Sequence, residues 1–162
     1  MKPPLFLLSG LLCDETVWAD IPERLADVAQ VSILSFGGFS SIAAMAEHVL
    51  TVAPERFALA GHSMGGRVAL ETVRSARSRI AGLALLNTGV HTVRDGEPQS
   101  RGRLLRLAYE KGMSALAAEW LPPMMAGGAR SAELMPRLAA MVERSTPDAY
   151  AGQINADRKS VV

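Results

Sequence analysis

The chain has 162 residues, of which 49% are hydrophobic and 20% are charged, as in one globular domain with enough apolar material for a core. Seventeen basic and 16 acidic residues leave a net charge of +1, so we expect no concentrated basic surface for nucleic acid. The single cysteine, Cys13, excludes an internal disulfide and fits a reducing compartment.

The N-terminus carries Lys2 and then an apolar run, a pattern shared with secretory signals. Ser9 and Gly10 interrupt this run, and Leu12 is bulky where a small residue should precede a cleavage site. No later stretch approaches the ~20 apolar residues of a membrane span. We therefore expect a cytoplasmic protein without membrane contact.

In the first half of the chain, short apolar runs alternate with amphipathic patterns of helical period. Ser40 or Ser41 is a plausible N-cap for the second of the helices, and Pro54 follows its end. This alternation predicts an α/β fold with a doubly wound parallel sheet and right-handed crossovers. The expected strands are residues 5–9, 31–36, 57–60 and 82–87, and the expected helices are residues 15–29, 41–53 and 64–76.

The second half of the chain has a different character. A polar loop spans residues 88–100, and helical patterns alone continue to about residue 157, with breaks at glycines and prolines such as Gly112. We predict one domain over residues 1–162, with a sheet core in residues 1–90. Residues 91–157 then form several short helices over the end of the sheet, as a lid would.

The most informative motif is Gly-His-Ser-Met-Gly at residues 61–65, which lies between the third strand and the third helix. The strand-to-helix context places Ser63 on a tight turn, as in a nucleophile elbow. A serine hydroxyl is a poor nucleophile unless it is exposed and lies beside a base. The motif therefore predicts Ser63 as a catalytic nucleophile, against the alternative of an ordinary glycine-rich turn.

Three stretches together resemble the α/β-hydrolase superfamily, and most closely its small cofactor-free serine hydrolases, such as carboxylesterases. These stretches are residues 7–14, followed by Trp18; the elbow at residues 61–66; and the strand end at residues 85–89. The resemblance implies an oxyanion hole built from the backbone N–H groups of Leu11 and Met64. It implies no cofactor and no metal, and a small acyl or ester substrate.

The resemblance also implies a catalytic acid and then a histidine after the serine, on turns that follow later strands. No such strands follow in this sequence, which stops where the family would enter its next strand. No residue matches the family's catalytic histidine, and the chain looks truncated.

Three histidines are candidates for a base. We expect His62 to have a buried structural role and His48 to lie at the surface or at the boundary of the core. His91 follows the fourth strand and could overhang Ser63, with Asp95 four residues later, or it could be solvated or contact substrate. We predict His91 and Trp18 as substrate-contacting residues.

Two other patterns have alternative interpretations. A basic stretch beside the predicted site could meet an acidic substrate or form a solvated helix face. A set of methionines and large apolar residues could line an acyl pocket or pack between helices. The basic residues are Arg94, Arg101, Arg103, Arg106 and Lys111, and the apolar ones are Met113, Trp120, Leu121, Met124 and Met125.

The sequence thus predicts a serine hydrolase of small esters. A hydrolase-like binding module that lacks the acid and base is the alternative, and a haloperoxidase-like or carbon–carbon bond hydrolase on the same scaffold is not separable by sequence. Without further strands, the fourth strand leaves a hydrophobic edge open, so we expect a homo-oligomer through this edge.

Overall fold

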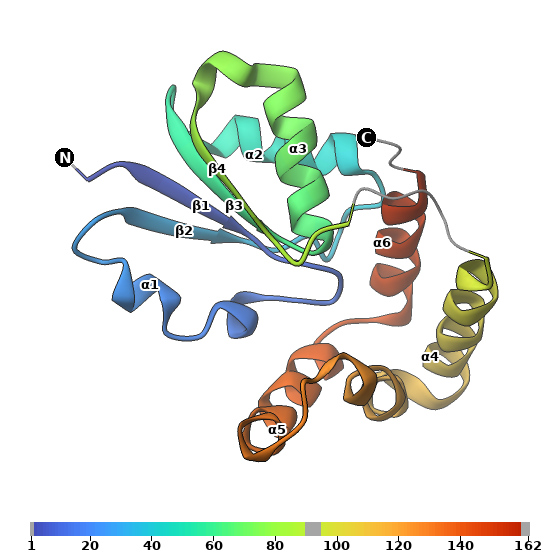
Figure 1. The fold of residues 1–162 in the computed structure, drawn as a ribbon. Helices are drawn as coiled ribbons and strands as arrows, with labels where there is room; N and C mark the ends of the chain where they lie inside the picture. Colours follow the sequence, from blue (N-terminus) through green and yellow to red (C-terminus); the bar gives the residue numbers. More distant parts are fainter. Residues whose placement is uncertain (1, 90–94, 160–162) are drawn as a thin grey trace.

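The computed structural model describes residues 2–89 and 95–159, and its centre is a parallel sheet of four strands (Figure 1). The strand order is β2-β1-β3-β4, so the chain reverses its direction of travel between β1 and β3. All four predicted strands are confirmed, with boundaries that differ by one or two residues. They are β1 (Pro4–Leu8), β2 (Gln30–Leu34), β3 (Phe57–His62) and β4 (Ile80–Leu86).

Two of the three predicted helices in this half are confirmed, α2 (Ile42–Val52) and α3 (Met64–Ala76). Ser41 caps α2, because its hydroxyl accepts a hydrogen bond from the backbone N–H of Ala44. Both helices pack on the same face of the sheet, where they meet alternate side chains of β1 and β3, such as Phe6 and Leu59.

The continuous helix predicted over residues 15–29 is wrong. The structure has a 3₁₀ turn, η1 (Glu15–Trp18), and one turn of helix, α1 (Ile21–Arg24). Ala19 lies between them with a φ of 42°, which no continuous helix allows. A proline directly follows Ile21 in the first turn of α1, where its missing N–H costs no helical hydrogen bond. The apolar side chains of this stretch are therefore only partly buried: Trp18 is buried, whereas Val28 is 63% exposed.

The two central strands, β1 and β3, are covered on both faces, as in a doubly wound sheet. Leu7 of β1 and Ala60 of β3 point away from α2 and α3 and pack with Trp18 of η1. Successive residues of β1 therefore enter two different clusters, because side chains alternate along a strand.

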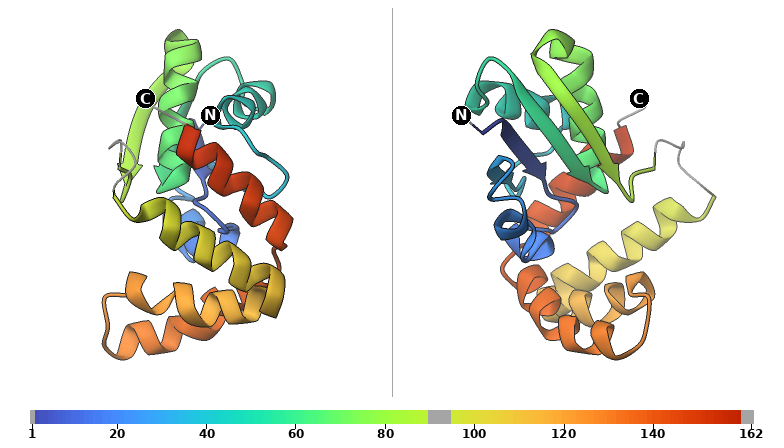
Figure 2. Two further views of the ribbon diagram at one scale, coloured as in Figure 1. Left: turned by 90° about the vertical axis from the view of Figure 1, so that its right-hand side faces the viewer. Right: turned by 60° about the vertical axis from the view of Figure 1, so that its left-hand side comes forward.

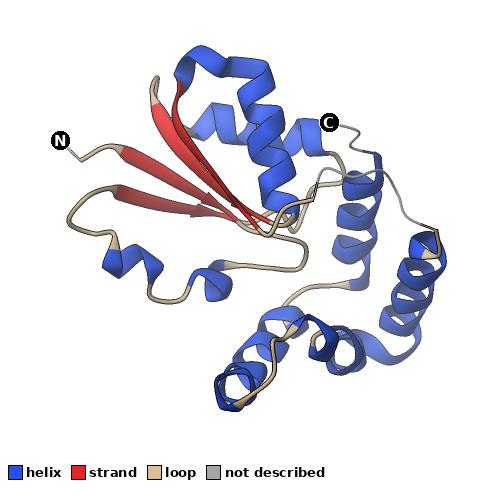
Figure 3. Cartoon of the chain, viewed as in Figure 1, coloured by secondary structure: helices blue, strands red, loops and turns tan. Residues whose placement is uncertain are grey.

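Helices alone follow the sheet, as predicted (Figure 3). They lie beyond the carboxyl ends of the strands, and α4 and α6 run side by side (Figure 2). The first is longer than expected, but Gly112, with a φ of 84°, breaks it where the sequence predicted a break. These elements are α4 (Glu97–Trp120), η3 (Pro122–Met124), α5 (Ala129–Glu143) and α6 (Pro147–Lys159). Among the described residues, no helix combines the length and apolarity that a membrane crossing requires.

β4 forms one edge of the sheet, and its side chains are unusually open to solvent. Leu83, Leu85 and Leu86 are 41%, 46% and 43% exposed. In the part of the chain that the structure describes, no strand pairs with the outer side of β4. An apolar strand with an unpaired edge is a template for pairing with another chain. Self-association through this edge stays a prediction.

We predict that the protein associates in a concentration-dependent manner and that Leu85→Lys suppresses this association, because a charge beside an open edge opposes pairing. Light scattering over a range of protein concentrations measures the mass. Val28→Lys is the matched control, since Val28 is also apolar and exposed but follows α1 on the other side of the sheet. A wild-type protein that stays monomeric at high concentration contradicts the prediction.

Candidate active site

Ser63 occupies the turn between β3 and α3 in a backbone conformation that side chains rarely adopt. Its φ is 54° and its ψ is −120°. The turn is held by three hydrogen bonds: Ser63 N–H donates to the carbonyl of Leu86 at 3.0 Å, and Ser63 C=O accepts from Gly66 N–H at 3.0 Å and from the Thr88 hydroxyl at 3.1 Å. Non-glycine residues in such conformations persist only where the surroundings enforce them, which is the geometry of a nucleophile elbow.

The glycines of the motif allow the elbow to pack against its neighbours. A Cβ atom on Gly65 would lie less than 3.0 Å from the carbonyl oxygens of Leu8 and Ser9, and one on Gly61 would overlap the backbone of the turn itself. A Cβ on Gly66 would overlap the side chain of Thr88. The turn thus touches the end of β1 backbone to backbone, and it touches the segment after β4 through the side chain of Thr88.

The turn after β1 comes close to the elbow as well. A Cβ on Gly10 would lie 3.0 Å from Nδ1 of His62 and 3.2 Å from Cβ of Ser63. The next residue, Leu11, lines the same cavity as Ser63 and Met64. Neither Leu11 N–H nor Met64 N–H has a hydrogen-bond partner within residues 2–89 and 95–159. For Met64 this follows from its place as the first residue of α3.

The cavity around Ser63 has a volume of about 390 Å³, within the range of small-molecule sites. One side is formed by the elbow and by Leu11, and the other by α4, η3, α5 and α6. Of the five residues considered for an acyl pocket, Met113 is buried in the helical core instead. The other four line the cavity: Trp120, Leu121, Met124 and Met125.

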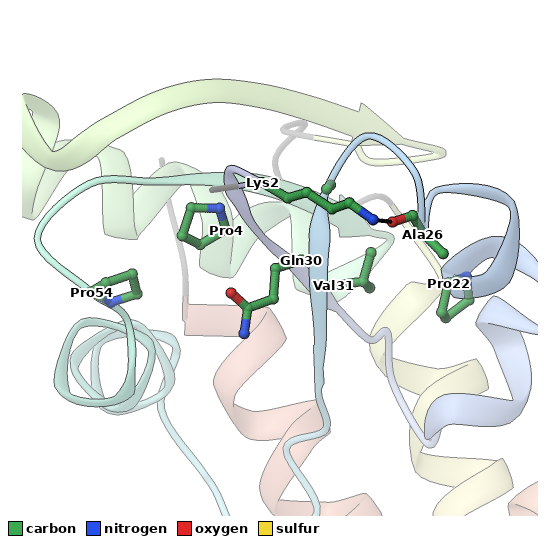
Figure 4. Close-up of a pocket in the computed structure, with 8 residues that line it drawn as sticks. Lys2, Pro4, Pro22, Ala26, Gln30, Val31 and Pro54 are labelled. Carbon is green, nitrogen blue, oxygen red and sulfur yellow. Dashed lines mark hydrogen bonds between the residues drawn. The ribbon is translucent and has the colours of Figure 1, made fainter.

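A second, larger hollow of about 710 Å³ lies near the amino ends of β1 and β2 (Figure 4). Its walls include three prolines, Pro4, Pro22 and Pro54, and Lys2, whose ammonium donates to the carbonyl of Ala26. Lys2 is the one ionisable residue among the described residues of its lining, and it is exposed. In a doubly wound parallel sheet, ligands bind at the opposite ends of the strands. Its size therefore does not make it the functional site.

The structure differs from expectation for His62. Its side chain is half-buried, packs edge-on against Trp18 with ring centroids 6.3 Å apart, and also lines the cavity. Burial lowers the pKa of His62, so the imidazole is neutral at pH 7. No hydrogen bond joins His62 to Ser63, and its buried Nδ1 has no partner among the described residues.

The other two histidines supply no base in the described part of the chain. His48 lies on α2 and packs against Phe39, with ring centroids 5.3 Å apart, outside the cavity lining. His91 and Arg94 lie outside the described residues. Asp95 is exposed. The arrangement of Ser63, His91 and Asp95 therefore stays a prediction.

Trp18 does not contribute to the cavity wall. The indole is 5% exposed, and its N–H donates to the hydroxyl of Ser9 at 3.0 Å. Trp18 thus packs against His62 without lining the cavity, and the neighbouring Val17 lines the cavity instead.

Cys13 also lines the cavity, but burial, with a smaller effect of Asp14, raises the pKa of its thiol to about 12. The thiol therefore stays protonated and cannot compete with Ser63 as a nucleophile at neutral pH.

A charged cluster that the sequence analysis did not identify lies beside the elbow. Arg67, one turn after Ser63, donates to the backbone carbonyls of Asp157 at 2.9 Å and of Gly89 at 3.0 Å. Arg101 of α4 bonds the carboxylate of Asp157 at 2.7 Å, and both residues line the cavity. These residues are up to 90 positions apart in sequence, so no local spacing reveals the cluster. Of the other basic residues in the predicted stretch, Arg103, Arg106 and Lys111 are exposed.

Two further contacts fix the helices on the turn after β1. The amide of buried Gln153 accepts a hydrogen bond from Leu12 N–H at 2.8 Å. Arg144, after α5, pairs with Asp14 at 2.7 Å. Burial alone would raise the pKa of Asp14, but hydrogen bonds from Thr16 and the pair with Arg144 outweigh it and lower this pKa.

Within the described ranges, no group of three or more His, Cys, Asp or Glu side chains could hold a metal ion.

We predict that Gly65→Ala lowers the free energy of unfolding by about 3 kcal/mol, because its Cβ would collide with rigid backbone at the end of β1. Urea unfolding measures the change. Gly102→Ala is the matched control: Gly102 lies within α4 with open space around it, and alanine there raises the stability by ~0.5–1 kcal/mol. Wild-type stability in Gly65→Ala would show that the close approach is not required.

We predict a loss of stability as the pH falls below the ordinary histidine pKa of 6.5, to which His62 contributes. The folded state binds a proton at His62 less readily than the unfolded state does, so protonation favours unfolding. Urea unfolding of wild type and His62→Gln at pH 8.0, 6.5 and 5.5 measures this effect. The stability difference between the two proteins should shift in favour of the variant as the pH falls, and a constant difference contradicts the prediction.

The comparison with solved structures supports the fold. The enol-lactonase from Burkholderia xenovorans LB400 matches with a TM-score of 0.82 and 22% sequence identity, over 99% of this chain and 66% of that one. A carboxylesterase structure from the thaumarchaeon Nitrososphaera gargenis matches with a TM-score of 0.80 and 15% identity, over 97% and 64%.

A thermophilic esterase from Thermogutta terrifontis, solved with malate bound, matches with a TM-score of 0.76 and 22% identity, over 98% of this chain and 64% of that one. The chain therefore spans about two thirds of the length of these three proteins. No curated protein sequence matches it.

The profile of the alpha/beta hydrolase family matches residues 5–159, nearly the whole chain. With the parallel sheet and the strained serine turn already described, this match shows that the chain belongs to the alpha/beta hydrolase family.

Proposed function

We propose that this protein is a serine hydrolase of small esters or related acyl compounds, with Ser63 as the nucleophile. The observation that carries the proposal is the strained conformation of Ser63 at the wall of a cavity of ligand size. The esterase and lactonase folds among the solved structures agree with chemistry at an acyl carbon.

In the proposed reaction, Ser63 Oγ attacks the carbonyl carbon of the ester, and the carbonyl π electrons move onto its oxygen. Collapse of this tetrahedral intermediate expels the alkoxide, which takes up the proton that left Ser63 and departs as the alcohol, and leaves an acyl group on Ser63. Water then attacks the acyl-enzyme in the same way and releases the acid. The proton of the Ser63 hydroxyl leaves during the attack, so full activity requires a base.

The backbone N–H groups of Leu11 and Met64 are the proposed oxyanion donors. Two observations support them: both residues line the cavity with Ser63, and both N–H groups lack partners among the described residues. Each such donor contributes about 3 kcal/mol to stabilising the oxyanion. Because the donors are backbone groups, their positions depend on the two turns and not on any side chain.

The second candidate is a binding module with the shape of a hydrolase. The observation that favours it is the lack of a hydrogen bond between Ser63 and any histidine in the described part of the chain. Such a protein would bind an acyl compound in the cavity without turning it over.

A fluorophosphonate probe separates the two candidates, because it reacts with activated serines. We expect stoichiometric labelling of the wild type, detected by intact mass, and loss of labelling in Ser63→Ala. Ser75→Ala is the matched control, since Ser75 is exposed on the same helix. A folded wild-type protein that does not react would leave only the binding module.

A further inference from the structure

The cavity at Ser63 adjoins a groove that the proposed reaction does not use. This groove has a volume of about 420 Å³ and lies beyond the carboxyl ends of β1 and β2, between the segments that follow these strands and the junction of α5 and α6. Among the described residues, two line both spaces: Cys13, on the turn after β1, and Met141 of α5. Their side chains therefore form a partition between the cavity and the groove.

The partition is a closed part of the cavity wall. Met124, which also lines the cavity, is 55% exposed, so the cavity opens to solvent beside η3. Met141 is 3% exposed and belongs to the helical core cluster, and Cys13 packs against that cluster. A methionine side chain is long and unbranched, whereas cysteine ends at its sulfur, so Met141 supplies most of the partition.

The groove on the far side of the partition carries polar groups. Thr146 contributes a hydroxyl, and the pair of Arg144 with Asp14 brings one charge of each sign. Gln153 is buried and accepts a backbone N–H at its Oε1, and its NH₂ group has no hydrogen-bond partner among the described residues. A hydroxyl at the end of a chain can both donate to and accept from such groups, whereas a methyl end can do neither.

We propose that Met141, together with Cys13, sets the limit of acyl-chain length of the substrate. The chain of an unbranched ester lies along the apolar side chains of the cavity, such as Leu121 and Leu138, and its methyl end stops at Met141. The substrate class is then esters of short unbranched acids, and a smaller side chain at position 141 lets a longer chain enter the groove. This inference rests on the proposed function for the position of the ester at Ser63, but binding of the chain does not require turnover.

Ester binding to the Ser63→Ala variant tests the proposal without hydrolysis. The probes are methyl hexanoate, methyl decanoate and methyl 10-hydroxydecanoate, and NMR signals report binding in the cavity, at the Trp120 indole, and in the groove, at the amides of Gly37 and Gly38. We expect every probe to shift the Trp120 signal and none to shift the glycine signals. Each buried methylene group can add roughly 4-fold in affinity, but methyl decanoate should bind less than about 4-fold more tightly than methyl hexanoate, because the partition stops its chain.

In the Ser63→Ala background, Met141→Ala opens the partition. Methyl decanoate should then gain about 10-fold in affinity relative to methyl hexanoate and shift the signals of Gly37 and Gly38. The terminal hydroxyl of methyl 10-hydroxydecanoate should add about 3-fold more in this variant.

Met141→Ala also removes buried contacts, which lowers stability. Met113→Ala is the matched control, because Met113 belongs to the same helical cluster but lines neither space, and it should keep the limit of chain length. Met141→Leu conserves volume and should keep the limit as well. Met141→Val, a smaller truncation, decides the outcome if Met141→Ala does not fold.

Three results would overturn the proposal: shifts of the Gly37 and Gly38 signals before Met141 is changed, an unchanged limit of chain length in a folded truncation of Met141, or the same gain in Met113→Ala. The absence of binding by every probe would overturn it too. None of these results depends on labelling of Ser63 by the fluorophosphonate, so failure of this inference is distinguishable from failure of the proposed function.

Discussion

The close approach of three backbone segments at the carboxyl ends of the strands is the constraint on which the rest of the structure depends. The turn at Ser63 touches the end of β1 through Gly65 and the segment after β4 through Gly66. Its strained φ of 54° is held by hydrogen bonds from both sides. Because the turn meets the backbone of β1 directly and the Thr88 side chain fills the space toward β4, the turn has little freedom to relax, and the strain persists at the wall of the cavity.

The same turn also positions the helices that close the cavity. Arg67 lies one turn of α3 beyond Ser63 and bonds the backbone of Asp157, and the Asp157 carboxylate in turn bonds Arg101. The Asp157 carboxylate is largely buried and pairs with both Arg67 and Arg101, so it joins the start of α3 to α4 and α6. The position of α4 and α6 over the cavity is therefore coupled to the geometry of the elbow.

The parts of this arrangement that depend on neighbours in sequence could be predicted, and the parts that depend on distant residues could not. The strand, the turn at Ser63 and the start of α3 follow one another directly, so pattern and glycine spacing were sufficient. The helix predicted over residues 15–29 failed because Ala19 adopts a positive φ that its sequence does not signal. The cluster of Arg67, Arg101 and Asp157 joins three separate helices, and only the fold brings them together.

The two sides of the cavity are made of different kinds of group. The proposed oxyanion donors are backbone N–H groups, which every substitution except one to proline preserves. The opposite wall consists of side chains on the helical segment, such as Trp120 of α4 and Tyr150 of α6. Tyr150 packs in the helical cluster, whereas Met64 packs against the sheet. A substitution that keeps the contacts of Arg67, Arg101 and Asp157 can therefore reshape the helical wall while the turn at Ser63 stays as it is.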